Sequence, residues 1–333
     1  MSNNDPLVSI IIPTYNRTAI IVRTLDSLLE QTYSNWECLV VDDGSEDSTE
    51  STINKYTLKD SRFRFFKRPY NRLKGANACR NYGFELSKGD YIIWFDSDDI
   101  MHPNFLESQI ENLEKHNLNY SICKSKWLTI EGKLLDGFRS SELNSINPIN
   151  DYIQFSVFWP INAVCYRRTF LDKHALQFDE TLQQSQEYDF HVKVLHVDRN
   201  YGIVDRELIT IVASEESISY SGINYIPKTE SSLKVRKRFL ANNKKYDLNI
   251  STKQFLLHDI HRIFQQTTMK RLRIISIYSA YIYLHSHLLD RAIFKKYFFK
   301  HVIPVISICI SYNLFGIGYK LFKKSNTFKY IKK

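Results

Sequence analysis

Several familiar signatures are absent from this chain of 333 residues. Its five cysteines are scattered and form no CxxC pair, which excludes a disulfide framework and a cysteine zinc site and suits a reducing compartment. The N-terminal stretch MSNNDPLVSIII has neither a basic region nor a cleavage site, so we expect no secretory signal. No segment matches GxGxxG or GxxxxGKS/T, and a protein that grips phosphate with a glycine loop is therefore excluded.

The residues that are present predict a packed protein with two unlike parts. Hydrophobic residues make up 43% of the chain and aromatic residues 14%, which is too much for a disordered protein. Residues 241–333 contain 17 basic and three acidic residues, a net charge of +14, so the first 240 residues carry −5 of the overall +9. An acidic front and a basic tail indicate two different roles.

Apolar runs alternate with helical patterns along the first hundred residues. The expected strands are 8–12, 36–41, 62–67 and 91–95, and the expected helices are 19–31, 46–56 and 75–87. This alternation predicts an α/β fold with a doubly wound, mainly parallel sheet, in which ligands bind at the carboxyl ends of the strands. The C-terminal part is predicted to be helical, basic and aromatic. We therefore expect domains at 1–231 and 232–333.

Three carboxylates follow the fourth expected strand: Asp96, Asp98 and Asp99 in the stretch YIIWFDSDD. Their mutual repulsion disfavours ionisation unless something compensates it. Helix capping would explain Asp99, because acidic side chains suit the start of the helix expected from residue 103. Three carboxylates at a ligand-binding edge are better explained by a hard cation with oxygen ligands. The pattern predicts a site for Mg²⁺ or Mn²⁺.

A second acidic turn, VVDDGS, ends the second expected strand and places Asp42 and Asp43 at the same edge. Asp-Gly between apolar runs usually marks a hairpin, but here a helix follows. A carboxylate in this position could accept the imide N–H of a uracil, and a plain turn aspartate is the open alternative.

The loop RPYNRLKG, residues 68–75, offers three basic side chains near this edge: Arg68, Arg72 and Lys74. Each could contact a phosphate group, because charge-assisted hydrogen bonds to phosphate are strong. A solvated charged loop explains the same residues equally well.

Four ordered motifs together resemble the inverting family 2 glycosyltransferases with the GT-A fold. The motifs are IIPTYNR (11–17), VVDDGS (40–45), ACRNYG (78–83) and WFDSDD (94–99). The resemblance extends from residue 8 to about residue 215. It implies a nucleotide-sugar donor, usually UDP-linked, and a divalent cation held by a DxD motif.

By position, the resemblance assigns two sets of donor-side residues. Those implied to contact the nucleotide, together with the basic loop candidates, are Pro13, Thr14, Tyr15, Asp43, Arg72, Lys74 and Asp96. Those implied to hold Mg²⁺ or Mn²⁺ are Asp96, Asp98 and Asp99. On this interpretation the cation relieves the repulsion within DSDD and stabilises the leaving diphosphate.

An inverting transferase also needs a base that takes the proton of the acceptor hydroxyl. The stretch FDETLQQSQEYDFHVKVL resembles the family segment that carries this carboxylate, usually as Glu-Asp followed by Tyr-Asp-Leu. This chain has Gln186 and Glu187 at the Glu-Asp position, so we assign the base to Glu187, with Asp189 as the alternative catalytic carboxylate. Both acids could instead simply open a helix. Trp159 is a candidate to stack on the donor sugar or acceptor, and a buried aromatic is the alternative.

The basic tail has the composition of a membrane-surface segment. The apolar stretch 302–319 approaches the ~20 residues that a spanning helix needs, but four residues interrupt it. These are Pro304, Asn313, Gly316 and Gly318. A helix lying in the interface, with its lysines on anionic lipid, fits better than a spanning helix or a partner-binding arm. No nucleic-acid motif is present, and we expect no nucleic-acid partner.

The sequence thus predicts an inverting glycosyltransferase that moves a sugar from a nucleotide-diphosphate donor, with UDP favoured, to a glycan or lipid-linked acceptor. Its expected place is the cytoplasm, peripheral on the inner face of the plasma membrane, in cell-surface polysaccharide synthesis. Two alternatives stay open. One is a metal-dependent nucleotidyltransferase on a similar scaffold, and the other is a catalytically dead nucleotide-sugar-binding protein.

Overall fold

The computed structural model describes residues 5–136, 142–213, 226–270, 273–288, 303 and 306–308. The chain divides into two compact units, residues 1–220 and 221–333. The predicted boundary after residue 231 falls within a helix of the second unit, α8 (Ile226–Ala241). The observed division, eleven residues earlier, keeps that helix whole.

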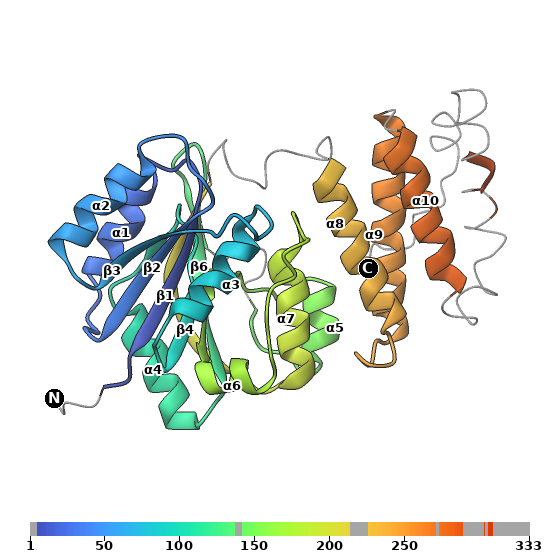
Figure 1. The fold of residues 1–333 in the computed structure, drawn as a ribbon. Coiled ribbons are helices and arrows are strands. Elements are labelled where there is room, and N and C mark those ends of the chain that lie inside the picture. Colours follow the sequence, from blue (N-terminus) through green and yellow to red (C-terminus); the bar gives the residue numbers. More distant parts are fainter. Residues whose placement is uncertain are drawn as a thin grey trace. The chain divides into compact units, whose positions relative to one another are not determined.

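The first unit is built on one curled sheet (Figure 1). Its described strands follow the order β3-β2-β1-β4-β8-β6-β9-β5, with β7 paired to β6. The strands are β1 (Val8–Thr14), β2 (Trp36–Asp42), β3 (Phe63–Lys67), β4 (Tyr91–Trp94), β5 (Ile100–Met101), β6 (Tyr120–Leu128), β7 (Leu134–Asp136), β8 (Val164–Arg167) and β9 (Gly202–Val212). The first four pair in parallel, as predicted. Beyond β4 the pairing is mixed, since β8 runs antiparallel to both of its neighbours.

Helices follow the strands of the first unit along the chain. They are α1 (Ile21–Leu29), α2 (Thr49–Lys59), α3 (Ala76–Leu86), α4 (Phe105–His116), α5 (Pro148–Ile153), the 3₁₀ turn η1 (Ile161–Ala163), α6 (Arg168–Lys173) and α7 (Gln186–Val197). All seven residues of β1 and of β2 are buried, as expected for central strands covered on both faces. The doubly wound α/β fold is therefore confirmed.

Close packing fixes α3 against the sheet. A Cβ atom on Gly83 would lie 2.3 Å from Cγ2 of Ile11, so only glycine permits this approach. The ring of Trp94, at the end of β4, packs edge-on against Phe178 and Phe190, with centroids 5.1 and 5.2 Å away. These contacts join β4 to α7 and to the segment that precedes it. The core thus holds the end of β4 next to the start of α7.

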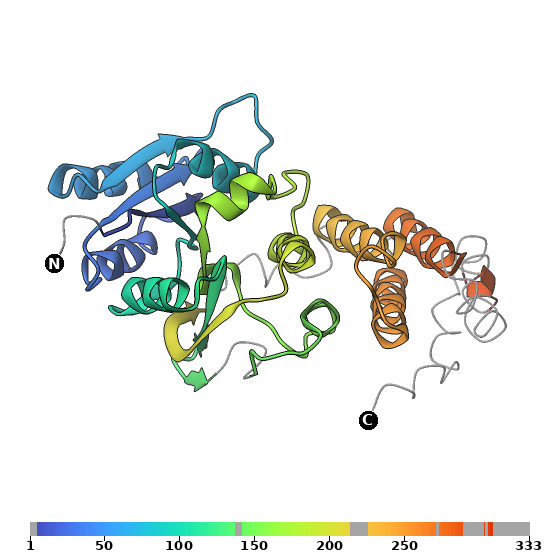
Figure 2. The ribbon, with the colours of Figure 1, turned by 90° about the horizontal axis from the view of Figure 1, so that it is seen from below.

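In the part of the second unit that the structure describes, three long helices lie side by side (Figures 1 and 2). They are α8, α9 (Ile250–Met269) and α10 (Arg273–Leu288). Asp259 of α9 is buried and pairs with Arg236 of α8 and, at 2.6 Å, with Arg262. Among the residues that the structure describes, no helix is both long enough and apolar enough to cross a membrane. The predicted interfacial segment, 302–319, lies outside the described residues except for 303 and 306–308.

Candidate active site

The carboxyl ends of β1, β2 and β4 meet at one edge of the sheet. Thr14 is paired in register with Asp42, and Ile11 of β1 is paired with Trp94 of β4. The Asp43 N–H donates to the Thr14 carbonyl oxygen at 2.9 Å. The predicted placement of DDGS and DSDD at one edge is therefore confirmed, because parallel neighbours end together, and the PTY segment ends at the same edge.

Asp43 is the centre of the candidate nucleotide side. Its carboxylate is buried and accepts hydrogen bonds from Arg68 Nε and, at 3.1 Å, from the Gly75 N–H. Gly75 has a φ of 141°, a conformation that L side chains rarely adopt. The loop 68–75 is thus folded around Asp43, which the sequence had offered only as a turn residue or a base contact.

The three residues at the end of β1 differ in exposure. Pro13 and Thr14 are buried, and Tyr15 is 40% exposed. The Thr14 hydroxyl has no hydrogen-bond partner within the described part of the chain, so a ligand could supply one. Lys74 Nζ lies 4.2 Å from the centroid of the Tyr15 ring, a cation–π geometry. Tyr15 and Lys74 therefore offer an exposed surface beside the strand ends.

Arg72, which the sequence offered as a phosphate contact, pairs with two carboxylates in this structure. Its NH2 group lies 2.7 Å from both carboxylate oxygens of Glu85, and its NH1 group lies 3.5 Å from Glu180. Two carboxylates therefore already use the charge of this guanidinium. The sequence could not show this, because Glu180 is far from Arg72 along the chain.

Side chains of helix α1 hold the DSDD loop by binding its main-chain carbonyl oxygens. Arg23 donates twice to the Asp98 carbonyl oxygen, from Nε at 3.1 Å and from NH2 at 2.6 Å. The Thr24 hydroxyl donates to the Asp99 carbonyl oxygen at 2.8 Å. Arg17 NH2 lies 3.8 Å from the Asp98 carboxylate. The hydrogen bonds from α1 thus fix the loop without engaging the Asp98 carboxylate.

Asp99 is a buried structural residue and not, as predicted, a metal ligand. Its side chain is buried, and its two oxygens accept hydrogen bonds from the Val212 N–H (2.9 Å) and from Asn162 Nδ2 (2.5 Å). Burial, followed by the charges of Asp98 and Asp96, raises the pKa of Asp99 well above its usual range. Asp99 therefore ties β4 to β9 and η1 rather than facing a ligand.

Asp96 and Asp98 remain as candidate donors for a cation. Their side chains are 37% and 20% exposed. Burial and the charge of Asp96 raise the pKa of the Asp98 carboxyl, so this position favours a positive neighbour. The described residues contain no group of three or more His, Cys, Asp or Glu side chains that could hold a metal. Two carboxylates fit Mg²⁺, which usually takes its other ligands from substrate phosphates and water.

The two candidate bases differ in access. Glu187 lies in the first turn of α7, is half-buried, and accepts a hydrogen bond from the Ile161 N–H at 3.1 Å. Asp189 is 1% exposed and its carboxylate lies 2.6 Å from Lys193 Nζ. Of these two carboxylates, an acceptor hydroxyl could reach only Glu187 in this arrangement. Asp189, the predicted alternative base, instead forms an ion pair with Lys193.

Trp159 is part of the core, and the expected sugar-stacking role is wrong. The side chain is 1% exposed. Its ring packs against Tyr152 at 4.8 Å, Tyr201 at 5.0 Å and His191 at 6.0 Å between centroids. No open ring face remains on which a sugar could stack.

Two residues that join the parts of the site had no assigned role in the sequence. Arg80, from the motif ACRNYG, contacts Asp96 and Gln186, and Asn162 contacts Asp99. The sequence did carry a signal for Arg80. A charged residue stands between Cys79 and Asn81 on a helix that packs against the sheet, and a buried arginine needs acidic or polar partners. Asn162 carried no such signal.

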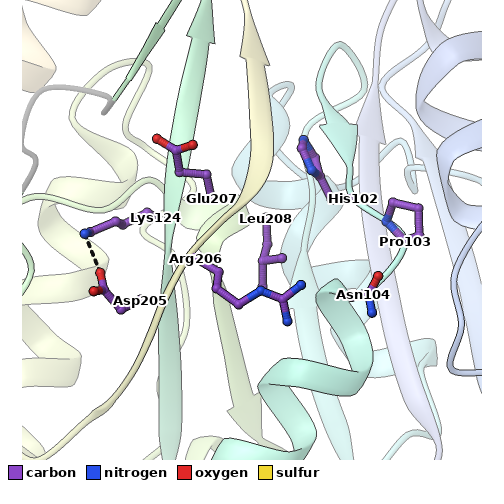
Figure 3. A pocket seen from close by; sticks show the side chains of 8 residues that line it. All are labelled: His102, Pro103, Asn104, Lys124, Asp205, Arg206, Glu207 and Leu208. Atoms are coloured by element: carbon purple, nitrogen blue, oxygen red, sulfur yellow. Dashed lines mark ion pairs between the residues drawn. The ribbon is translucent and has the colours of Figure 1, made fainter.

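A cavity of about 480 Å³ lies elsewhere in the unit (Figure 3). It is lined by His102, Pro103, Asn104, Lys124, Asp205, Arg206, Glu207 and Leu208. Lys124 and Asp205 form an ion pair at its side. No predicted site residue lines this cavity, and its mixed charges favour no single ligand.

Comparisons with known proteins agree with the geometry. Residues 9–173 match the family model described as glycosyl transferase family 2, a match that ends before Glu187. An uncharacterized glycosyltransferase of Rickettsia typhi is 31% identical over 262 residues, which are 76% of this chain and 78% of that protein.

A second relative and a solved structure resemble this chain in different ways. The Escherichia coli protein WfgD, a UDP-Glc:alpha-D-GlcNAc-diphosphoundecaprenol beta-1,3-glucosyltransferase, is 41% identical over 137 residues, 40% of this chain and 52% of WfgD. The crystal structure of S. aureus TarS 1-349 in complex with UDP-GlcNAc superposes with a TM-score of 0.70 at 19% identity. It covers 95% of this chain and 91% of the TarS chain, a likeness of fold.

Proposed function

This chain belongs to glycosyltransferase family 2 and has a GT-A-type fold, and from this premise we propose its substrates and chemistry. It transfers a sugar, with inversion, from a UDP-linked donor to a hydroxyl group of a glycan or lipid-linked acceptor in cell-surface polysaccharide synthesis. The name of WfgD, with its UDP-glucose donor and diphosphoundecaprenol-linked acceptor, supports this class of substrates. The UDP-GlcNAc bound to TarS supports a UDP-linked donor. Family membership sets the nucleotidyltransferase alternative aside.

One observation carries the proposal: a half-buried carboxylate is held beside the donor edge by the same segment that holds DSDD. The Ile161 N–H donates to Glu187, and the next residue, Asn162, donates to Asp99. Two neighbouring residues of η1 therefore connect the base to the loop that carries Asp98. Such a connection places an acceptor base and a donor site together, as a transfer between two bound substrates requires.

The residues divide the reaction between them. Asp96 and Asp98 would hold Mg²⁺ or Mn²⁺, which when bound supplies positive charge that stabilises the leaving diphosphate. Thr14 and Tyr15 line the nucleotide. Glu187 takes the proton of the acceptor hydroxyl as that oxygen bonds to the anomeric carbon, and the bond from this carbon to the diphosphate oxygen breaks. Inversion follows, because attack and departure occur on opposite faces of the sugar.

We expect UDP to bind this chain about tenfold more tightly than GDP in the presence of Mg²⁺, since a hydrogen bond to a charged group contributes about 1.5–3 kcal/mol. The physical reason is the Asp43 carboxylate, which would accept the imide N–H of uracil. Isothermal titration calorimetry of the wild-type chain with both nucleotides measures the difference. The wild type is the right material because Asp43 also holds Arg68 and Gly75. Equal or tighter binding of GDP would show that the pocket reads another base edge.

The basic tail is proposed to hold the protein peripherally on the inner face of the plasma membrane, close to a lipid-linked acceptor. Lysines near an anionic surface contribute about 1 kcal/mol each, and salt screens them. A chain ending at residue 294 should leave the membrane fraction and lose transfer to a lipid-linked acceptor far more than it loses donor hydrolysis. The measurement is co-sedimentation with anionic vesicles.

A matched variant of the full-length chain separates charge from apolar contact in the tail. It carries glutamine at Lys323, Lys324, Lys329 and Lys332. Binding to anionic vesicles should weaken in this variant and in high salt. If the shortened chain still sedimented with vesicles, or the intact chain ignored them, the tail would have another partner.

A further inference from the structure

A single buried side chain contacts both halves of the proposed site. Arg80 of α3 is 6% exposed. Its NH2 group donates to Asp96 Oδ1 at 2.8 Å, and its NH1 group donates to Gln186 Oε1 at 3.1 Å. A guanidinium can serve two acceptors at once because its donors form a rigid planar fork, which a lysine ammonium lacks.

Gln186 is fixed at both ends of its amide. Its oxygen accepts from Arg80, and its nitrogen donates to the Leu182 carbonyl oxygen at 2.9 Å. Gln186 is the first residue of α7 and directly precedes Glu187. A displacement of this amide therefore displaces the backbone that carries the base.

Other residues of α3 hold the same stretch of chain. Asn77 Nδ2 donates to the Asp179 carbonyl oxygen at 2.7 Å, and Asn81 Nδ2 donates to the Phe178 carbonyl oxygen at 3.0 Å. These bonds would keep the fold of the segment without Gln186. The bond from Arg80 to Gln186 thus sets where α7 begins, and the helix would still form without it.

The neutral amide at position 186 leaves the arginine charge to Asp96. A carboxylate at this position would compete with Asp96 for Arg80 and would stand beside Glu187, a second negative charge. Glutamine accepts the hydrogen bond without that competition. Asp96 therefore keeps its ion pair with Arg80, and Glu187 keeps its position at the start of α7.

We propose that Arg80 and Gln186 form a positioning pair that sets Glu187 relative to the donor carboxylate Asp96. This inference rests on the proposed function, because it assigns the pair to the transfer reaction. In this proposal both are positioning residues. Arg80 acts through Asp96 on the donor side, and Gln186 acts through the first turn of α7 on the base side.

The test compares Gln186→Met with Gln184→Met in the full chain. Methionine keeps the length of the side chain and removes the acceptor, so kcat for a UDP-sugar should fall about tenfold, because small misplacements of catalytic groups are costly. KM for that sugar nucleotide and the Kd of UDP alone should stay within about twofold, since Asp96 keeps Arg80. Gln184→Met, a matched change two residues earlier, should keep wild-type kcat. The turnover assays start from UDP-glucose and UDP-GlcNAc.

A second variant tests the charge argument. Gln186→Glu keeps an acceptor for Arg80 but divides its charge, so KM for the UDP-sugar should rise several-fold. Gln186→Met with unchanged kcat, or with kcat and KM altered equally, overturns the positioning pair. Gln186→Glu with an unchanged KM also overturns it. A wild-type chain that neither binds UDP nor turns over a UDP-sugar refutes the proposed function, and the inference with it.

Discussion

Replacing Glu187 by glutamine should lower the rate of sugar transfer by about 10²–10⁴-fold, the usual contribution of a positioned general base. Glutamine keeps the shape of the side chain and can still accept the hydrogen bond from the Ile161 N–H. It cannot take the proton of the acceptor hydroxyl. The Kd of UDP should therefore stay at the wild-type value, and the loss should appear in kcat.

Asp189→Asn is the matched control for this change, because it makes the same substitution two residues along α7. Asp189 is buried and pairs with Lys193, so the variant should lose stability in thermal unfolding but keep most of its transfer rate. A nearly inactive Asp189→Asn beside an active Glu187→Gln would move the base by two residues. Rapid-quench kinetics with a UDP-sugar and a lipid-linked acceptor would distinguish the two results.

Asp98→Asn should abolish both transfer and the part of UDP binding that depends on a divalent cation. Losing one of two carboxylate ligands removes several kcal/mol of charge stabilisation at the leaving diphosphate. The fold should survive, because Arg23 holds this loop through the Asp98 carbonyl oxygen and not through the side chain. Calorimetry of UDP with Mg²⁺ and with a chelator measures the effect directly.

Asp99→Asn serves as the control for Asp98→Asn. The Asn162 Oδ1 atom is buried without a hydrogen-bond partner in the described part of the chain, so a turned Asn162 amide could accept from a new asparagine at position 99. We expect this variant to keep cation-dependent UDP binding. Near-normal turnover by Asp98→Asn, or full wild-type activity in excess chelator, would contradict the metal role of the DSDD loop.

Features that depend on neighbours along the chain were predictable from the sequence. The alternation of strands and helices implied parallel pairing of β1 to β4, and parallel pairing implied that Asp43 and Asp96 meet at one edge. The preference for Glu187 over Asp189 also began in the sequence. Access to solvent now supports the same choice.

Features that depend on distant partners were not predictable. Asp99 stands in the same acidic run as Asp98, yet its oxygens bind Val212 and Asn162, which are 113 and 63 residues away. Composition cannot tell a buried clamp from a ligand when both are aspartates. Trp159 was misassigned for the same reason, because residue type alone does not report whether an aromatic ring keeps an open face.

The assignment of cation binding to Asp96 and Asp98 and of proton transfer to Glu187 is tested most directly by measuring UDP affinity and transfer rate in the same three proteins. These are the wild type, Asp98→Asn and Glu187→Gln, each with Mg²⁺ present. The account predicts that Asp98→Asn loses both affinity and rate, whereas Glu187→Gln keeps the wild-type affinity and loses only the rate. If the two variants lost affinity and rate together, or if Glu187→Gln transferred sugar at the wild-type rate, the assignment of Glu187 as the base opposite a donor site at Asp96 and Asp98 would be wrong.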